Sequence, residues 1–188
     1  MKKLLVFLLL PVFTISCNRN DNKINFEPIG YFSTKYTLQT GAPRQGTLVP
    51  ESKGVIIMDS TYIKGLTELN DFEYIWVLYY FNKAKSYDLI ISPPNSHHKF
   101  GVFATRSPRR PNPIGLSLVK LDSIVENRLY INDVDAFDKT PVLDIKPFLP
   151  SVDYVNSKRN IDAEIYLGHH NNDYINDSLI NEFVLGKP

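Results

Sequence analysis

Residues 74–81 constrain the fold of this chain more than any other segment. The run Tyr-Ile-Trp-Val-Leu-Tyr-Tyr-Phe contains eight β-branched, aromatic or leucine residues in succession. Such residues favour extended backbone, and a short unbroken apolar run is typical of a strand that is buried on both faces. The segment therefore predicts a central strand around which the rest of the domain packs.

Shorter strand patterns flank this run, and turn residues separate them at short intervals. No long helical segments alternate with the strands, so the pattern disfavours a doubly wound fold and favours an antiparallel barrel or sandwich. One helical turn is expected at residues 65–71, and Asp177 is expected to cap a short helix that Gly186 closes. The other strands are expected at residues 26–33, 54–58, 88–92, 116–122, 128–132, 141–145 and 162–167.

The first 17 residues have the character of an export signal. Lys2 and Lys3 precede the almost unbroken apolar run 4–15, which is too short to span a bilayer, since that needs about 20 residues. A basic start, a short apolar stretch and a small residue form the signal-peptide pattern. Ser16 and Cys17 resemble the end of a bacterial lipoprotein signal, so we expect Cys17 to be lipidated and to anchor the chain to a membrane of the cell envelope. The alternatives are an uncleaved apolar leader or a start codon placed too far upstream, either of which would leave the protein in the cytoplasm.

We expect four parts along the chain: a signal at residues 1–17, a polar tether at 18–25, a folded domain at 26–153 and a strand and helix extension at 154–188. About 165 residues remain after the signal and the tether, which is enough for one domain with its own core. Cys17 is the single cysteine. No disulfide can therefore form within one chain, and the fold must depend on packing.

Charge is nearly balanced over the whole chain, with 21 Lys and Arg against 20 Asp and Glu. A strongly basic nucleic-acid-binding protein has a different composition. The distribution is uneven, because residues 17–120 carry 13 basic and 8 acidic groups whereas residues 121–188 carry 6 and 12. A local basic patch is therefore expected in the first part.

Residues 101–115 hold three prolines and three arginines between two glycines. Proline fixes φ and lacks a backbone donor, so this segment predicts a stiff loop rather than a regular element. The loop presents the guanidinium groups of Arg106, Arg109 and Arg110, which suit carboxylates and phosphates because they bind them in a bidentate manner. Composition alone leaves two interpretations open: a solvated loop or a site for an anionic ligand.

The four histidines form two adjacent pairs, at residues 97–98 and 169–170. Adjacent side chains point to different sides of an extended chain, and no cysteine or paired carboxylate lies at ligand spacing, so no metal site is expected. The sequence also lacks a glycine-rich phosphate loop, a Gly-x-Ser-x-Gly motif and a Cys/His pair.

Residues 100–121 resemble the signature of the TrmO family, whose members are also called TsaA-like proteins. Blocks at residues 42–45, 65–78 and 133–150 are similar to the family in the same order, and the resemblance covers about residues 26–153. It implies a small antiparallel β-barrel that acts as a methyltransferase dependent on S-adenosyl-L-methionine (SAM). The implied substrate is the exocyclic amine N(6) of a threonylcarbamoyl-modified adenosine beside the tRNA anticodon. The resemblance also implies a homodimer with the cofactor site near the subunit interface.

The resemblance implies a set of cofactor contacts as well. A carboxylate in such a pocket can bind the ribose hydroxyls or the ammonium of SAM, while an arginine can hold its carboxylate. The alternatives are a surface salt bridge for Arg44 and Arg106, and turn capping for Asp133 and Asp135. The matching positions are Pro43, Arg44, Gln45, Asn82, Lys83, Arg106, Leu116, Asn132, Asp133, Val134 and Asp135.

Methyl transfer to an adenine amine needs alignment and an acceptor for the amine proton, since the nitrogen lone pair is delocalised into the ring. Asp138 is our prediction for this acceptor, and formation of a turn before Pro141 is an equally weighted alternative. Arg109, Arg110 and Lys146 are predicted to contact tRNA phosphates, with a plain contribution to solubility as the alternative.

Three features depart from the family pattern. The family usually has His-Gln at Asn82 and Lys83, and Lys83 places a cation near the sulfonium of SAM. Lys139 replaces the usual glycine of an Asp-Gly-Thr-Pro turn, which is strained if φ is positive there. The leader would remove the chain from cytosolic SAM and tRNA. Two functions therefore compete: a SAM-dependent tRNA methyltransferase, and an exported, lipid-anchored and catalytically degenerate barrel that binds a small ligand or a protein.

Overall fold

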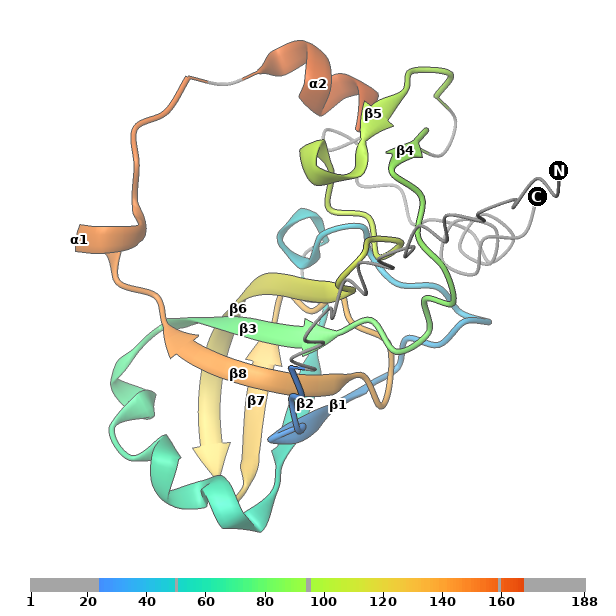
Figure 1. Ribbon diagram of the computed structural model, residues 1–188. Coiled ribbons are helices and arrows are strands. Elements are labelled where there is room, and N and C mark those ends of the chain that lie inside the picture. Colours follow the sequence, from blue (N-terminus) through green and yellow to red (C-terminus); the bar gives the residue numbers. More distant parts are fainter. Residues whose placement is uncertain (1–23, 50, 94–95, 159, 168–188) are drawn as a thin grey trace, which may run out of the picture.

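The computed structural model describes residues 24–49, 51–93, 96–158 and 160–167 of the 188-residue chain (Figure 1). The predicted signal, the lipidation site Cys17, most of the polar tether and the helix expected from Asp177 lie outside the described residues. Within the described part, no helix is both long enough and apolar enough to cross a membrane.

Six antiparallel strands close into a barrel in the order β1-β2-β7-β6-β3-β8. Because these six strands close on one another, the barrel has no open sheet edge. The expected mainly β architecture, a small antiparallel barrel, is confirmed. The strands are β1 (Gly30–Thr34), β2 (Gly54–Met58), β3 (Tyr74–Tyr80), β6 (Ile114–Val125), β7 (Arg128–Asn132) and β8 (Pro141–Pro147).

β3 is the central strand that the sequence predicts, and it pairs with β6 on one side and with β8 on the other. Its side chains alternate: Ile75, Val77 and Tyr79 are buried inside the barrel, whereas Tyr80 is exposed. The prediction of burial on both faces is therefore wrong for this strand. A closed barrel has one interior, and the outer face of β3 is only partly covered, for example by the edge contact of Trp76 with Phe148 at 6.0 Å between ring centroids.

The barrel interior is filled by aliphatic and aromatic side chains from all six strands. Each fully buried side chain of this size contributes roughly 1.5–3 kcal/mol from removal of apolar surface from water. Phe32 and Tyr79 meet edge to face with ring centroids 5.5 Å apart. The core residues include Phe32, Ile56, Ile75, Val77, Val119, Leu129, Ile131, Val134 and Val142.

A long excursion leaves the barrel between β3 and β6. It carries a two-stranded sheet of β4 (Ile90–Ile91) and β5 (Phe100–Gly101), followed by a short 3-10 helix, η4 (Val102–Ala104). The excursion lies beyond the upper end of the barrel in Figure 1. Its return is fixed to β3 by a hydrogen bond from the Phe81 amide to the Pro113 carbonyl at 2.8 Å.

Three further 3-10 helices connect the strands: η1 (Gly46–Leu48), η2 (Ser60–Leu66) and η3 (Leu69–Asp71). The last two correspond to the helical turn expected before β3. They cover one end of the barrel, where Leu66 and Leu69 pack against the core. These two leucines therefore close the lower end of the barrel in Figure 1.

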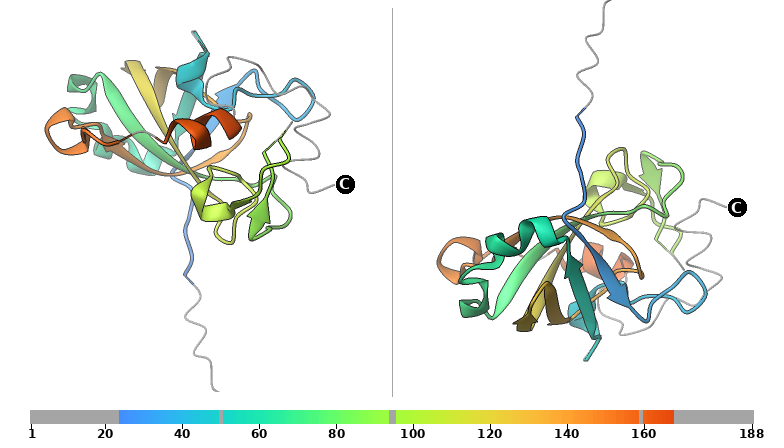
Figure 2. Two further views of the ribbon diagram at one scale, coloured as in Figure 1. Left: turned by 90° about the horizontal axis from the view of Figure 1, so that it is seen from above. Right: turned by 90° about the horizontal axis from the view of Figure 1, so that it is seen from below.

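Within the described residues, two short helices follow β8: α1 (Pro150–Asp153) and α2 (Ile161–Tyr166). The strand predicted at residues 162–167 is wrong, because Asn160 caps a helix there through a hydrogen bond from the Ala163 amide to its side chain at 3.1 Å. α2 lies beside β5, over the barrel in the view from above (Figure 2). The His98 and Tyr166 rings stack at 4.5 Å with an interplanar angle of 11°.

Candidate functional site

A cavity of about 690 Å³ lies where the excursion meets the barrel. This volume is within the range of small-molecule sites. Its walls come from five segments of the chain, residues 42–45, 76–93, 103–116, 135–140 and 167, and its lining mixes apolar side chains with a small set of charged ones. The cavity brings together nine of the residues predicted for cofactor or substrate binding: Pro43, Arg44, Gln45, Asn82, Lys83, Arg106, Arg110, Leu116 and Asp135.

The loop of residues 42–46, here called the Pro-Arg-Gln loop, is held against the opposite wall by close backbone contact. A Cβ atom on Gly46 would lie 1.6 Å from the Asp133 carbonyl oxygen, so only glycine fits. Asp133 itself has φ of 62°, and the next amide, of Val134, bonds the Ser52 carbonyl at 3.0 Å. The contact at Gly46 therefore places the Pro-Arg-Gln loop beside the turn at Asp133, so that two distant parts of the predicted cofactor site are neighbours.

Arg106 projects from the arginine loop (residues 105–113) toward the Pro-Arg-Gln loop. Its guanidinium donates a short hydrogen bond to the side-chain oxygen of Gln45. The side-chain nitrogen of Gln45 in turn donates to the Arg44 backbone carbonyl at 2.7 Å. Arg106 has no carboxylate partner in the part of the chain that the structure describes, which disfavours the surface salt bridge for this residue. The hydrogen bond to Gln45 orients the Arg106 side chain in the wall of the cavity.

The guanidinium groups of Arg44 and Arg110 also donate hydrogen bonds to backbone carbonyl oxygens. The Arg44 guanidinium donates to the Leu167 carbonyl at 3.3 Å, which brings the end of α2 to the cavity wall. The Arg110 guanidinium donates to the Thr105 carbonyl, also at 3.3 Å, and so folds back on its own loop. The cavity is therefore bordered by three guanidinium groups.

Asp135 is the carboxylate among the residues that line the cavity. It accepts hydrogen bonds from the Ser117 hydroxyl at 2.6 Å and from the Tyr79 hydroxyl at 3.4 Å. Burial, only partly offset by hydrogen bonds from Ser117 and the Gly46 amide, raises the pKa of Asp135 to about 6. Burial also raises the pKa of Tyr79 well above its ordinary value, so its hydroxyl remains a donor.

Sequence reasoning missed Tyr79 and Ser117. Tyr79 reaches Asp135 because Gly115 has no side chain: a Cβ there would lie 2.3 Å from the tyrosine ring. Ser117 is buried and lies on the inward face of β6 beside Val119 and Leu121. A single hydroxyl on an otherwise apolar inward face is the signal that could have identified it, because buried polar groups need partners.

Three residues predicted for the cofactor pocket lie outside the cavity lining. Asn132 donates to both carboxylate oxygens of Asp122, at 2.8 and 2.7 Å. Val134 is fully buried in the barrel core, where it fills space among apolar side chains. Asp133 occupies the left-handed turn that precedes Asp135, and burial raises its pKa. All three directly precede Asp135 in the chain, so they support the cavity wall and do not line the cavity.

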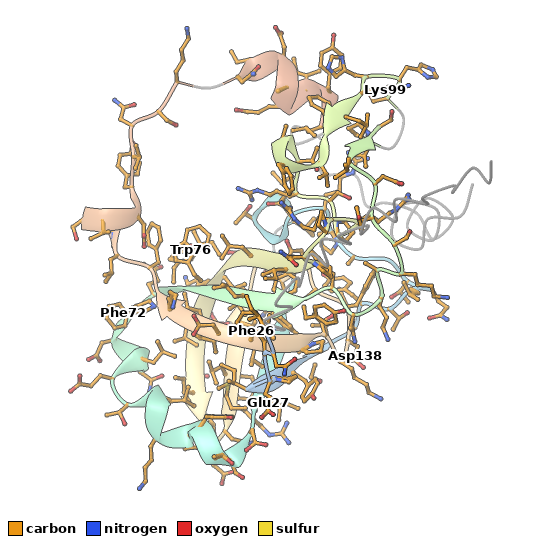
Figure 3. All side chains as sticks on the ribbon, viewed as in Figure 1. Phe26, Glu27, Phe72, Trp76, Lys99 and Asp138 are labelled. Carbon is orange, nitrogen blue, oxygen red and sulfur yellow. The ribbon has the colours of Figure 1, made fainter. Side chains whose placement is uncertain are left out.

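Asp138, predicted as the proton acceptor, also lies outside the cavity lining. Its carboxylate accepts a hydrogen bond from the Thr34 amide at 3.2 Å, and its own amide bonds the Tyr36 carbonyl at 2.7 Å. Figure 3 shows Asp138 beside the start of β8, at the opposite end of that strand from Trp76, which pairs with Lys146. The alternative of turn formation before Pro141 therefore describes this residue.

Two of the predicted phosphate contacts are already paired. Arg109 forms an ion pair with Asp88, and Lys146 forms one with Asp144 at 2.5 Å. Both lie outside the cavity lining, whereas Arg110 lies in it. Within the described residues, no three His, Cys, Asp or Glu side chains gather as a metal site requires.

The closed antiparallel barrel and its cavity define the class of protein, a β-barrel domain with a small-molecule site. The guanidinium groups and the carboxylate that line the cavity suit a polar ligand that carries both positive and negative charge. Residues 31–154 match the family model described as tRNA-methyltransferase O N-terminal domain. The chain belongs to this family.

Several relatives support the same assignment. The S-adenosyl-L-methionine-binding protein of Archaeoglobus fulgidus is 41% identical over 130 residues, which cover 69% of this chain and 93% of that protein. The mouse tRNA (adenine(37)-N6)-methyltransferase is 36% identical over 151 residues, which cover 77% of this chain and 34% of the enzyme. The similarity of this chain therefore extends over about a third of the mammalian protein.

Among solved structures, the crystal structure of TrmO from Pseudomonas aeruginosa is similar with a TM-score of 0.61 and 34% sequence identity. The match covers 73% of this chain and 61% of the TrmO chain. The fold predicted from the resemblance therefore agrees with an experimental structure of the family.

Proposed function

We propose that this protein is a SAM-dependent methyltransferase that modifies the exocyclic amine of a modified adenosine beside the tRNA anticodon. One observation carries the proposal: the family blocks of the sequence converge on one cavity, which Arg44, Arg106 and Asp135 line together. The family assignment and the relatives named as SAM-binding proteins and tRNA methyltransferases support it.

The residues present fit SAM. Its carboxylate suits a guanidinium, because paired N–H donors match the two carboxylate oxygens. Arg44 and Arg106 would hold that carboxylate, and apolar side chains such as Leu116 and Phe81 offer surface for the adenine ring. A cavity of about 690 Å³ has room for the cofactor and part of an acceptor.

Bound SAM supplies the methyl group, and the residues of the chain align the acceptor and remove its proton. We assign proton acceptance to Asp135 rather than Asp138, because Asp135 lines the cavity. A pKa of about 6 leaves this carboxylate mostly ionised at neutral pH yet basic enough to take a proton. Tyr79 and Ser117 orient it through their hydroxyl groups.

Calorimetric titration of SAM into residues 18–188 tests cofactor binding. We expect saturable binding for the wild type and none for Arg106→Ala, because the variant lacks the guanidinium beside Gln45. Arg128→Ala is the matched control, since Arg128 lies on β7 outside the cavity lining and its loss should leave binding unchanged. No heat at millimolar SAM would exclude the methyltransferase function.

Transfer of labelled methyl groups to tRNA tests the reaction itself. We expect incorporation into tRNA that carries the modified adenosine and none into an unmodified transcript. Asp135→Asn should lower kcat by roughly 10²- to 10⁴-fold, the usual contribution of a general base, with SAM affinity largely retained. Loss of SAM affinity with kcat retained would assign Asp135 to cofactor binding instead.

We propose further that the protein forms a homodimer with the cavity near the subunit interface. Apolar side chains at the cavity are exposed in the single chain: Phe103 by 75% and Leu116 by 51%. Exposed apolar patches of this kind commonly mark protein interfaces. Analytical ultracentrifugation should give twice the chain mass, and Leu116→Asp should shift the equilibrium toward monomer.

Lipid anchoring through Cys17 is a separate proposal, supported by the basic and apolar leader that precedes it. Labelling of the native host with palmitate should mark the protein and a Cys17→Ser variant should lose the label. A labelled protein outside the cytoplasm would not meet tRNA, and its barrel would then act as a ligand-binding module. An unlabelled protein in the cytosolic fraction favours tRNA modification.

A further inference from the structure

The helix α2 has six residues and lies beyond the part of the chain that the family model matches, which ends at residue 154. A helix of this length is marginal in water by itself, so its order depends on contacts with the rest of the protein. Residues 154–158, which lead to it, are all exposed and contribute little packing. The contacts that hold α2 must therefore come from residues 160–167, here called the strap.

One face of the strap packs against the rest of the protein. Ala163, Glu164 and Leu167 are half-buried, whereas Ile161 and Ile165 are exposed. Residues 163 and 167 are four positions apart and so lie on the same face of the helix. This face ends at Leu167, which lines the cavity.

Two contacts join the strap to two different walls of the cavity. The last carbonyl groups of a helix have no partner within it, and the Arg44 guanidinium of the Pro-Arg-Gln loop donates to that of Leu167 at 3.3 Å. The Tyr166 ring stacks on His98 at 4.5 Å between centroids, and His98 also contacts Phe100 of β5 at 4.5 Å. The strap therefore bridges the Pro-Arg-Gln loop and the excursion that carries β4 and β5 (Figures 1 and 2).

The strap covers part of the cavity without filling it. A volume of about 690 Å³ remains open while Leu167 is among the lining residues. The Leu167 carbonyl also fixes the orientation of the Arg44 guanidinium in the wall. A ligand in this space lies beneath the strap, so departure of the strap would remove part of its cover and let the guanidinium rotate.

We propose that the strap closes over a ligand bound in the cavity and slows its release, and that His98 and Tyr166 are positioning residues that hold the strap in place. The proposal rests on the SAM-dependent function above only for the ligand used as a probe. Closure over a bound ligand acts mainly on the rate of dissociation. An aromatic pair changes such an equilibrium by roughly 2- to 10-fold, which is weak enough for the strap to open and large enough to measure.

Amide hydrogen exchange without ligand tests whether the stacked rings hold the strap. Tyr166→Ala should speed exchange of the Glu164 amide, which bonds the Asn160 carbonyl at 3.0 Å, by roughly 2- to 10-fold. Tyr166→Phe keeps the ring and should restore the wild-type rate. Tyr154→Ala is the matched control, because Tyr154 is 76% exposed on the segment before the strap. Unchanged exchange in Tyr166→Ala would overturn the proposal.

Titration with SAM tests closure over the ligand. Tyr166→Ala should weaken SAM binding by roughly 2- to 10-fold through faster dissociation, whereas Tyr166→Phe and Tyr154→Ala should bind like the wild type. SAM should also slow exchange of the Glu164 amide in the wild type. Unchanged affinity in Tyr166→Ala would overturn the proposal, and so would tighter binding, because the strap would then obstruct the cavity. If the wild type does not bind SAM, the methyltransferase proposal fails, and exchange without ligand still decides whether the strap docks through His98.

Discussion

The carboxyl group of Asp135 is partly accessible from the cavity and accepts hydrogen bonds from hydroxyl and amide donors around it. Because its folded-state pKa of about 6 exceeds the ordinary value of 3.8, the folded state binds more protons than the unfolded state between these pH values. The stability that protonated Asp135 contributes is therefore fully present below about pH 4 and is lost as pH rises through about 6.

Asp135→Asn should remove this pH dependence. Relative to the variant, the wild type should lose roughly 2–3 kcal/mol of unfolding free energy between pH 4 and pH 7, the equivalent of two pK units. Chemical denaturation at a series of pH values measures the difference. Asp71→Asn, at an exposed position on η3, should keep the wild-type slope, and parallel curves for wild type and Asp135→Asn would contradict the assignment.

Lys139 has φ of 60°, the left-handed conformation at which the sequence predicts strain, because the family usually has glycine there. A left-handed conformation costs a residue with a Cβ atom roughly 1–2 kcal/mol. Glycine avoids this cost, but it also makes the unfolded state more flexible, which cancels part of the gain in stability. Lys139→Gly should therefore raise the unfolding free energy by roughly 0.5–1 kcal/mol. Lys139→Ala keeps the Cβ atom and loses only the charge, so a gain of equal size in that variant would disprove the backbone explanation.

The location of a residue at the cavity was predictable where its side chain needs only to reach the lining, whereas its role stays a prediction. Arg106 and Gln45 belong to separate blocks of the sequence, and the barrel joins them by a hydrogen bond. The choice between Asp135 and Asp138 could not be made in advance, because it depends on which residues of one short loop turn inward. Tyr79 was predicted only as part of an apolar strand, since its hydroxyl acquires a partner through Gly115 on the neighbouring strand.

At the scale of elements, the contact between the Pro-Arg-Gln loop and the turn at Asp133 decides whether the cavity forms. Gly46→Ala would place a Cβ atom 1.6 Å from a backbone oxygen, so the loop must move. We expect a loss of roughly 1–3 kcal/mol of stability and at least a 10-fold loss of SAM affinity. Gly65→Ala is the control, because nothing lies within 4 Å of its Cβ position, and it should change stability by less than about 0.5 kcal/mol.

Strands were predictable as elements, whereas the short C-terminal helix was not. The six barrel strands fall within or next to the segments expected from apolar runs and turn residues. Residues 162–167 carry mixed propensities over too short a length for periodicity to decide. The cap at Asn160 and the stacking of Tyr166 on His98 decide the outcome, and the second of these is a contact between distant parts of the chain.

For the whole molecule, the join between β1 and β8 is the weakest part of the barrel. The ladder between these strands is short, with Gly30 and Tyr31 opposite Val142 and Pro141, and proline provides no amide to it. Backbone hydrogen bonds of Ile29 and Phe32 to residues 139–142 extend the contact slightly. β3 and β6, in contrast, pair over the full length of β3. Amide hydrogen exchange measured by NMR should show faster exchange at the β1 and β8 join than at Val77, and uniform protection around the barrel would contradict this order.

Barrel closure was not derivable from strand patterns alone, since the same patterns suit a sandwich. The resemblance to a known family supplied the barrel, and the observed strand order agrees with it. In space β7 lies between β2 and β6, so it pairs with β6, which precedes it directly, and with β2, which lies much earlier in the chain. Such long-range choices depend on the whole core and leave no local signal.

The cavity walls come from segments that span most of the described chain, from Ala42 to Leu167. No fragment contains the site, so a ligand can bind only the closed molecule and never the unfolded chain. Ligand at 100 times its Kd would then add roughly 2.7 kcal/mol to the folding free energy. The amount of folded protein in a cell would accordingly follow the supply of its own cofactor.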